Sequence, residues 1–317
     1  MIPKIIHFVW LGGGKYPPPV QDCIDSWKRI LPDYTIKRWD ETNFDIDSVP
    51  WVKEAIQMRK WSLASDYIRH FALYTEGGIY MDTDVKVFRP FDEFLSWDFF
   101  SSVEYHPTYF LSQGIHQIDD AGVVRRDGDI VAGLGLLAAL IASKEANPFI
   151  KECLDYYGSR HFIQEDGSLY VDVINPGIMA MLATKYGFRY KDENQLLDGN
   201  MMVYSSSIFA GDPATRSKES YSMHYCDGSW REKTLKTRMK DYIKGILYKK
   251  NLLAELNYKR FMFKKLCILL IFSKLNEIKH LIDKYRMHNL YAIFAKLLNI
   301  CKQIAGNLVN ESGNVPR

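Results

Sequence analysis

The residues with the clearest chemical potential are two aspartates separated by one residue. Asp82 and Asp84 follow a short apolar run, and if the strand continues through them, its period of two places both carboxylates on one side. Adjacent carboxylates repel each other unless a cation lies between them, and a hard divalent ion shared with diphosphate oxygens meets that need. An isolated Asp-x-Asp is more often a surface turn. A calcium loop with Glu93 at position twelve fits poorly, because Lys86 and Val87 replace an oxygen ligand and the turn glycine.

A second cluster, Ser65, Asp66 and Arg69, lies one expected helix earlier. Asp66 and Arg69 are three residues apart and therefore share a helix face. An ordinary surface ion pair of this kind contributes little. Here, however, the rest of the helix is mostly apolar, and its end reaches the acidic pair through only Gly77-Gly78. A carboxylate and a guanidinium beside a metal diphosphate could bind sugar hydroxyls and offset charge on a leaving group.

Two further sites involve aromatic and histidine side chains. Trp10 ends an apolar run and offers a flat face on which a nucleobase could stack, although a core position is the simpler interpretation. His224 could add a metal ligand, and Gly228-Ser229 could bring backbone donors close to a phosphate. Without such partners the segment is a loop with a buried histidine, and its His-x-Cys spacing is too short for a zinc site.

The elements that must position these residues alternate between strands and helices. Apolar periodicity and turn residues predict strands at 4–11, 35–40, 79–81, 85–88, 99–103 and 201–204, and helices at 20–31, 60–75, 147–160 and 176–186. Such alternation predicts an α/β fold with a mainly parallel sheet flanked by helices. The acidic pair then lies at the carboxyl edge of the sheet, where open sheets bind ligands.

Composition and charge divide the chain of 317 residues into an acidic body and a basic tail. Residues 231–317 carry 19 Lys/Arg against 6 Asp/Glu, a net charge of +13, which leaves −10 for residues 1–230. An acidic body is not a nucleic-acid-binding core. We expect a catalytic domain over 1–230 and a basic, helical C-terminal extension over 231–317. Its segments 236–250 and 258–272 could lie on an anionic membrane surface or could cap the catalytic domain.

The remaining patterns exclude several classes of protein. The five cysteines are odd in number and far apart, which argues against a disulfide framework and favours a reducing compartment. The first residues lack the pattern of an export signal, and the apolar stretch Leu266–Phe272 is far shorter than the roughly 20 residues that span a bilayer. We therefore expect no segment of the sequence to span a membrane. Dinucleotide, P-loop and nucleophile-elbow motifs are missing from the sequence.

Three segments together resemble a known family. They are IIHFVWLGG (5–13), LASDYIRHFALYTEGGIYMDTDV (63–85) and HYCDGSW (224–230). They are similar to the retaining glycosyltransferases with a DXD motif, glycosyltransferase family 32. That family includes capsule and lipopolysaccharide enzymes and initiating mannosyltransferase homologues, and it is related to the catalytic domains of clostridial glucosylating toxins. The resemblance implies a GT-A type fold and metal-dependent, retaining transfer of a hexose from a UDP-sugar to a glycan acceptor that is linked to a lipid. It also implies a cytoplasmic enzyme, which the basic tail could hold at the inner face of the plasma membrane.

The resemblance also implies roles for individual residues. The catalytic set is Asp66, Arg69, Asp82 and Asp84, and Mn²⁺ or Mg²⁺ would be bound by Asp82, Asp84 and His224. The implied donor-binding residues are Val9, Trp10, Leu11, Asn43, Ser65, Asp66, Arg69, Asp82, Thr83, Asp84, Gly228, Ser229 and Trp230. Asn175 corresponds to the acceptor side, where this chain has Asn-Pro-Gly instead of the Thr-Gly-Pro of many members.

Two functions from other classes remain open at this stage. A metal-dependent phosphohydrolase would use the acidic pair to activate water on a diphosphate, and would release a sugar phosphate and a nucleoside monophosphate. A non-catalytic protein that binds a membrane surface or a glycan would need the acidic cluster only for its structure. It would show no metal-dependent affinity for nucleotides.

Overall fold

The computed structural model describes residues 1–171 and 173–226, and its centre is an eight-stranded sheet. Its strands are β1 (Ile5–Val9), β2 (Thr35–Trp39), β3 (Gly78–Met81), β5 (Phe99–Tyr105), β6 (Leu134–Leu136), β7 (Leu140–Ser143), β8 (Gln195–Leu197) and β9 (Met201–Tyr204). Their order is β2-β1-β3-β7-β5-β9-β8, with β6 paired to β5. Along this path β7 and β8 run opposite to the other five strands. The predicted α/β fold with a mostly parallel sheet is confirmed.

A second, three-stranded sheet has the order β10-β11-β4. Its strands are β4 (Val85–Val87), β10 (Phe209–Ala210) and β11 (Ser222–His224). β11 runs antiparallel to β4, with His224 opposite Val85. This register brings the histidine next to the residue that precedes β4, which is Asp84.

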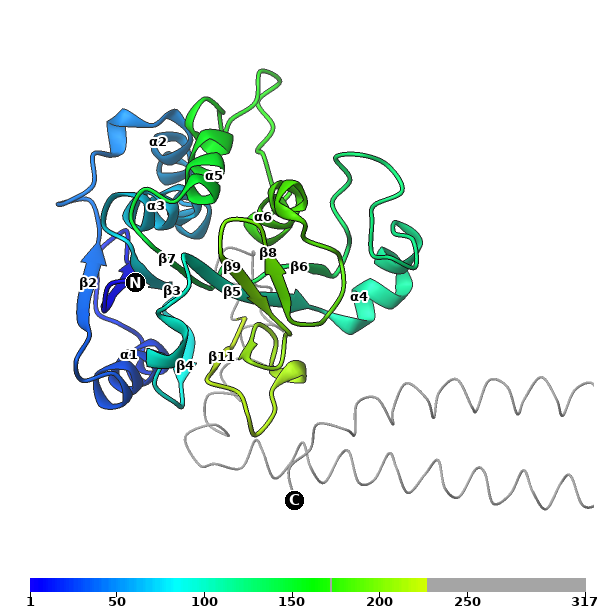
Figure 1. Ribbon diagram of the computed structural model, residues 1–317. Coiled ribbons are helices and arrows are strands. Elements are labelled where there is room, and N and C mark those ends of the chain that lie inside the picture. The colour runs from blue at the N-terminus through cyan, green and yellow to red at the C-terminus, as the bar shows by residue number, and fades with distance from the viewer. Residues whose placement is uncertain (172, 227–317) are drawn as a thin grey trace, which may run out of the picture. The chain divides into compact units, whose positions relative to one another are not determined.

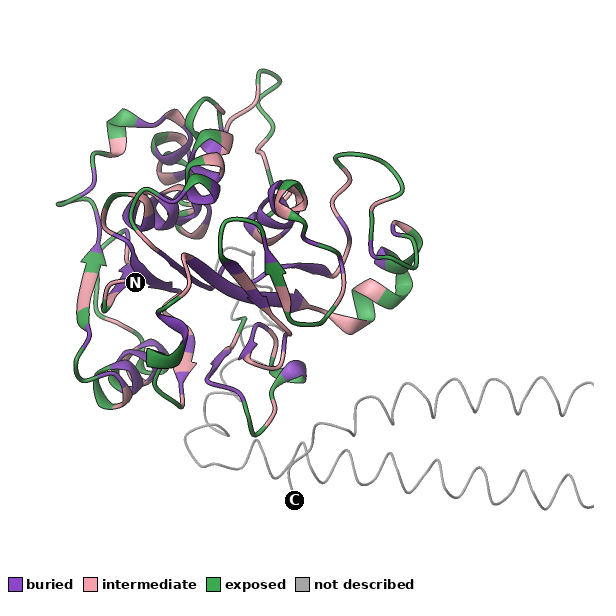
Figure 2. Ribbon diagram, in the orientation of Figure 1, coloured by how far each residue is buried: buried purple, intermediate pink, exposed green. Residues whose placement is uncertain are grey.

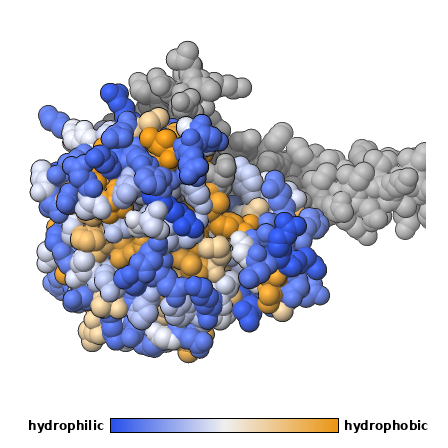
Figure 3. All heavy atoms as spheres, turned by 90° about the horizontal axis from the view of Figure 1, so that it is seen from above, coloured by the Kyte–Doolittle hydropathy of each residue, from blue (hydrophilic) through white to orange (hydrophobic). Residues whose placement is uncertain are grey.

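Helices cover both faces of the large sheet (Figure 1). They are α1 (Pro18–Ile30), α2 (Pro50–Gln57), α3 (Trp61–Glu76), α4 (Pro107–Ser112), α5 (Pro148–Gly158) and α6 (Asn175–Ala183). One hydrophobic core joins α2, α3, α5 and α6 to one face of the sheet, and a second core joins α1 and the small sheet to the other. Figure 2 shows the central strands mostly buried, whereas the edge strands β2 and β8 and the outer faces of the helices carry exposed residues. In the view from above, Figure 3 shows a largely hydrophilic surface with hydrophobic residues in separate small areas.

Alternation along β3 links the two cores. Tyr80 packs in the core that contains α3, whereas Ile79 and Met81 pack in the core that contains α1. This is the period of two expected for a strand buried on both faces. Tyr80 is therefore presented to the same helix that carries Asp66 and Arg69.

The predicted elements are found within a few residues of their expected bounds. The expected helix 60–75 is α3, and the expected helix 147–160 is α5, whose cap Asn147 accepts hydrogen bonds from the amides of Phe149 and Ile150. The sequence analysis did not predict α2, α4 or strands β6, β7, β8, β10 and β11. β6 and β7 lie in one continuous apolar stretch, in which periodicity cannot separate two short strands.

The connection from α3 to β3 depends on two glycines with positive φ, 63° at Gly77 and 108° at Gly78. A Cβ on Gly78 would lie 2.6 Å from the Ile5 carbonyl oxygen, which is closer than real contacts allow. We expect Gly78→Ala to lower the free energy of unfolding by about 3 kcal/mol or more, because β1 and β3 would have to separate.

Gly187→Ala is the matched control for that substitution. Gly187 also has a positive φ, 96°, but nothing lies within 4 Å of its Cβ position. Its substitution should cost only about 1 kcal/mol of backbone strain. Urea unfolding of both variants measures the difference, and equal losses of stability would contradict the proposed clash.

Other expectations fall partly or wholly outside the described residues. The domain boundary at 230–231 and the whole extension 231–317 lie outside them, so both stay predictions. Within the described residues, Cys153 and Cys226 form no disulfide. None of the helices in this part of the chain has the length and apolar character that crossing a bilayer requires.

Candidate active site

The first half of the site is a buried ionic network on α3. Arg69 lies 3.0 Å from Asp66 and 3.5 Å from Asp82, measured between guanidinium nitrogens and carboxylate oxygens. The guanidinium also donates to the Ala138 carbonyl oxygen at 2.7 Å and to the Ser65 hydroxyl at 3.0 Å. Asp66 and Arg69 are 6% and 4% exposed. Such a buried network holds the guanidinium in one orientation, which an exposed surface ion pair would not do.

Burial sets the charge state of this network. It raises the pKa of Asp66 to about 7; the Arg69 guanidinium opposes this rise and the Asp82 carboxylate adds to it. Burial also disfavours the Arg69 charge, but Asp82, Tyr80 and Asp66 outweigh it and raise the Arg69 pKa. Asp66 can therefore both donate and accept a hydrogen bond near neutral pH, while Arg69 stays cationic.

The second half of the site is a cluster of three possible metal ligands. Carboxylate oxygens of Asp82 and Asp84 and a ring nitrogen of His224 all lie within 4.8 Å of one another. His224 Nε2 is 3.2 Å from an Asp84 carboxylate oxygen. Burial lowers the pKa of His224, but the Asp84 carboxylate outweighs it, so the pKa lies well above its ordinary value. Once its ring is deprotonated, as metal binding requires, His224 and the two carboxylates form a donor set that fits Mn²⁺ or Mg²⁺, and a cation would offset the repulsion between the aspartates.

Asp82 and Asp84 lie in a turn and not in a continuous strand, which the sequence analysis had considered. β3 ends at Met81, and residues 82–84, including Thr83, form the turn before β4. The turn is closed by a hydrogen bond from the Val85 amide to the Asp82 carbonyl, at 3.0 Å. The Asp84 carbonyl accepts from the Tyr225 amide at 3.1 Å, which fixes the turn to the chain after β11. The two carboxylates thus converge because of a turn and not because of strand alternation.

The residues expected to bind the nucleotide surround the same edge of the sheet. Trp10 directly follows β1 and is half-buried; its ring packs edge-on against Tyr16, with 5.0 Å between ring centroids. Val9 ends β1, whereas the side chain of Leu11 is buried in the core. Asn43 closes the turn after β2 by donating to the Arg38 carbonyl at 2.8 Å. Nucleotide binding by these residues stays a prediction.

Asn175, expected on the acceptor side, is 2% exposed and lies beneath the α3 network. Its side-chain oxygen is 3.1 Å from His70 Nε2, and its amide group lowers the pKa of Asp66. Burial lowers the pKa of His70 to about 3, so the ring is neutral and Nε2 donates to Asn175. The expected residues Gly228, Ser229 and Trp230 lie outside the described residues.

The structure adds residues that the sequence analysis missed. Tyr80 donates a hydrogen bond to Asp82 at 2.7 Å. The Arg69 guanidinium lies over the Tyr80 ring, with its Cζ atom 4.6 Å from the ring centroid. The Ala139 carbonyl accepts from the Asp82 amide at 2.9 Å. The alternation along β3 could have identified Tyr80, because position 80 must face away from its neighbours 79 and 81. No sequence pattern indicates the contacts from Ala138 and Ala139.

A second charged cluster lies at the end of β5. His106 Nδ1 is 2.8 Å from Asp212 and its Nε2 is 3.0 Å from Glu104, measured to carboxylate oxygens. Hydrogen bonds to Asp212 and Glu104 raise the pKa of His106 to about 10, although burial opposes the shift. This cluster is near enough to His224 for that residue's charge to lower the pKa of Asp212.

The His106 cluster makes stability depend on pH. Below the ordinary histidine pKa, about 6.5, the ring is charged in both states and its ion pairs stabilise the folded form in full. This contribution is lost as the pH rises from about 6.5 towards the folded-state pKa of about 10.

We expect His106→Gln to lower the free energy of unfolding by about 2 kcal/mol at pH 6 and by almost nothing above pH 10. Urea unfolding across this range measures the effect. The exposed His116→Gln is the control, and a cost of His106→Gln that is constant with pH would contradict the assignment.

Comparison with known proteins identifies the region that contains this site. Residues 17–100 match the family model described as the glycosyltransferase sugar-binding region containing a DXD motif. The resemblance to DXD glycosyltransferases is confirmed over these residues. They include Ser65, Asp66, Arg69, Asp82 and Asp84, and therefore all of the expected catalytic set.

Two curated relatives come from Schizosaccharomyces pombe. Inositol phosphoceramide mannosyltransferase 3 is 32% identical over 103 residues, which cover 30% of this chain and 28% of the relative. Inositol phosphoceramide mannosyltransferase 1 is 27% identical over 139 residues, covering 37% and 43%. The chain thus spans less than half the length of the curated relatives it matches. Among solved structures it is similar to the PaToxG glycosyltransferase, with 19% identity, a TM-score of 0.38, and coverage of 58% of this chain and 69% of that one.

Proposed function

We propose that the protein is a metal-dependent glycosyltransferase of the GT-A type that transfers a hexose from a UDP-sugar to a hydroxyl of a glycan acceptor, with retention at the anomeric carbon. The observation that carries the proposal is the convergence of Asp82, Asp84 and His224 beside the buried Asp66–Arg69 pair. This arrangement lies at the carboxyl edge of the sheet, where nucleotide ligands bind in open α/β folds.

In this proposal the cation would be held by Asp82, Asp84 and His224. When bound, Mn²⁺ or Mg²⁺ supplies Lewis acidity for the departing diphosphate. Asp82 connects the two halves of the site, since it belongs to the ligand cluster and also lies 3.5 Å from Arg69. Its position is fixed by the Tyr80 hydroxyl and the Ala139 carbonyl.

The chain's own residues account for the rest of the chemistry. Arg69 provides fixed positive charge where negative charge develops on the leaving group, and its buried contacts prevent reorganisation. The Asp66 carboxylate binds hydroxyls of the donor sugar and thereby orients the sugar. The bond from the anomeric carbon to the phosphate oxygen breaks, and a bond to the acceptor oxygen forms on the same face. The acceptor proton passes to a departing phosphate oxygen, and a nucleoside diphosphate is released.

Substrate identity is proposed from the similar proteins and from charge. The relatives are named for mannosyl transfer to a lipid, which supports mannose as a candidate sugar and a lipid-linked acceptor. The net charge of +13 in residues 231–317 supports attachment to an anionic membrane surface from the cytoplasmic side. Such a location suits an enzyme of capsule or lipopolysaccharide synthesis.

Nucleotide binding tests the donor part of the proposal. We expect UDP to bind the full chain with Mn²⁺ present and to bind at least about tenfold more weakly in excess EDTA, because the cation would share the diphosphate oxygens. Trp10→Ala should weaken binding by about 1–3 kcal/mol through lost base stacking, and Tyr109→Ala, an exposed aromatic substitution on α4, should not. Affinity unchanged by EDTA would contradict the metal site. Preference for GDP over UDP would instead revise the assigned base.

A further inference from the structure

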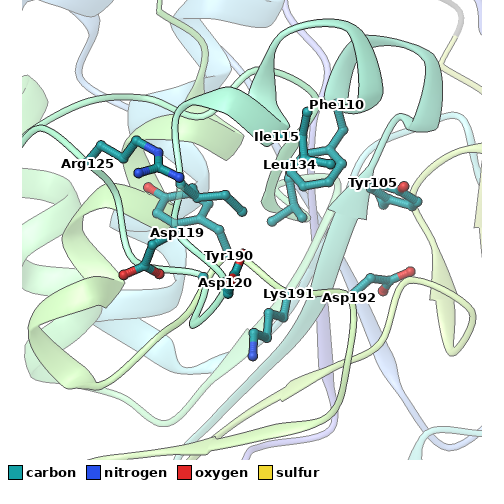
Figure 4. A pocket seen from close by; sticks show the side chains of 12 residues that line it. Tyr105, Phe110, Ile115, Asp119, Asp120, Arg125, Leu134, Tyr190, Lys191 and Asp192 are labelled. Atoms are coloured by element: carbon teal, nitrogen blue, oxygen red, sulfur yellow. The ribbon is translucent and has the colours of Figure 1, made fainter.

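A pocket of about 410 Å³ lies beyond the end of β5, apart from the metal-ligand cluster. It is lined by side chains from four separate segments: Tyr105 of β5, Phe110 of α4, the loop residues Asp120 and Arg125, and Tyr190 with Lys191. In Figure 4, Phe110, Ile115 and Leu134 gather on one side, and Arg125 and Asp119 lie with Tyr190 on the other.

The lining has the chemistry of a saccharide site. Aromatic rings offer flat faces to the C–H side of a sugar ring, and Tyr105 and Phe110 form an edge-to-face pair with centroids 5.6 Å apart. Around them are carboxylate, guanidinium and ammonium groups that can bind hydroxyls. Within residues 1–171 and 173–226 the structure gives no ion pair to Asp120, Arg125 or Lys191. The lining thus combines apolar rings with groups that can form hydrogen bonds to hydroxyls, a combination that suits a sugar.

The pocket wall is built by close backbone packing. A Cβ on Gly133 would lie 2.4 Å from the Phe110 amide nitrogen, and one on Gly114 would lie 2.1 Å from the Ala132 carbonyl oxygen. The loop itself is closed by Asp119, which accepts hydrogen bonds from the amides of Ala121 and Val123, both at 2.9 Å. The Tyr190 amide donates to the Gly122 carbonyl at 2.8 Å, which fixes the loop to the opposite wall.

The sheet connects the pocket directly to the catalytic network. β6 runs antiparallel to β5, with Leu134 of the pocket opposite Tyr105. Leu134 is the first residue of β6, and Ala138, whose carbonyl oxygen accepts a hydrogen bond from Arg69, follows only four residues later. At a reach of at most about 3.6 Å per residue, the two Cα atoms lie within about 14 Å of each other. A short oligosaccharide could therefore contact the pocket and the reacting centre together.

We propose that this pocket binds a sugar unit of the acceptor glycan and thereby determines acceptor choice. The inference rests on the proposed glycosyltransferase function and adds an acceptor subsite separate from the donor contacts. The subsite holds a part of the acceptor that does not react. Its binding energy places the reacting hydroxyl at the anomeric carbon, as remote substrate contacts do in other enzymes.

Phe110→Ala and Tyr109→Ala, neighbours on α4, form a matched pair for the test. Phe110 lines the pocket, whereas Tyr109 is 61% exposed and does not. Transfer is measured with p-nitrophenyl glucoside, galactoside and mannoside as acceptor probes, and hydrolysis of the donor is measured without acceptor. We expect Phe110→Ala to raise the acceptor KM at least about tenfold and to leave the donor KM and donor hydrolysis within twofold of the parent. Tyr109→Ala should change neither. Equal effects of the two variants, or a matching rise in donor KM, would overturn the proposal.

Asp120→Asn and Asp127→Asn repeat the test without touching packed side chains. Both residues are exposed in the same loop, and only Asp120 lines the pocket. We expect the acceptor KM to rise with the first substitution alone, and no change would count against the pocket.

A binding measurement separates this proposal from the proposed function. Saturation-transfer NMR with methyl glucoside, galactoside and mannoside detects sugar binding to the full chain whether or not transfer occurs. We expect binding that is lost in Phe110→Ala, retained in Tyr109→Ala, and not displaced by UDP with Mn²⁺. Such binding without any hydrolysis or transfer would remove the transferase function and keep a saccharide site. Absence of binding by all three glycosides, or displacement by UDP, would overturn the acceptor subsite even if the enzyme is active.

Discussion

Asp84→Asn should abolish metal-dependent transfer, lowering kcat at least about a thousandfold, while the fold remains intact. The substitution removes one of two carboxylate charges in the ligand cluster, and metal stabilisation of a leaving group is worth several kcal/mol. The turn would survive, because its hydrogen bonds from the amides of Val85 and Tyr225 go to backbone carbonyls. Steady-state kinetics and Mn²⁺ titration measure the loss of activity and of metal affinity together.

The control for this substitution is Asp155→Asn. Asp155 forms a surface ion pair with Lys151 on α5, and its removal should change activity by less than twofold. Folding of Asp84→Asn is verified by circular dichroism and urea unfolding. A folded Asp84→Asn enzyme with parental activity would eliminate the metal cluster as the catalytic centre.

Arg69→Lys should reduce kcat by about 10²–10³-fold, although the positive charge is retained. Lysine is a point charge without the planar fork, so it cannot keep the contacts with Asp66, Ser65 and the Ala138 carbonyl at once. The loss should appear in kcat and kcat/KM, whereas Mn²⁺ affinity should change little because Arg69 is not in the ligand cluster.

Arg29→Lys, an exposed substitution on α1, is the comparison for the Arg69 variant and should behave like the parent. Part of the Arg69 loss could arise from a weakened core, so activity is measured well below the unfolding transition of each variant. If Arg69→Lys retained the parental kcat, the guanidinium would have no role in stabilising the leaving group.

Local patterns were sufficient to predict much of this site. The helical spacing of Asp66 and Arg69 and the two glycines after α3 are short-range features, and the structure shows the ion pair and the tight connection that they imply. The match of residues 17–100 to the DXD family model covers the same features.

Contacts between distant segments were beyond such reasoning. The family resemblance grouped His224 with Asp84, but no local pattern predicts the register of β11 on β4 that joins them. Nor does one predict the contact of Ala138 with Arg69 across 69 residues of sequence. Neither pairing leaves a periodic trace in one sequence. The same holds for the His106 cluster, in which Asp212 comes from a loop 106 residues away. The direction of β7 was also hidden, because its short apolar run reads the same in either orientation.

The most direct test of the central claim is release of nucleoside diphosphate from a panel of nucleotide sugars that includes UDP-glucose, UDP-galactose and GDP-mannose. The full chain is assayed with Mn²⁺ and then with excess EDTA, with and without the glycoside acceptors. We predict release from one donor that is accelerated by acceptor, lost on chelation and absent in Asp84→Asn. Release of sugar phosphate and nucleoside monophosphate would identify a phosphohydrolase instead, and release that is unaffected by both EDTA and Asp84→Asn would contradict the account.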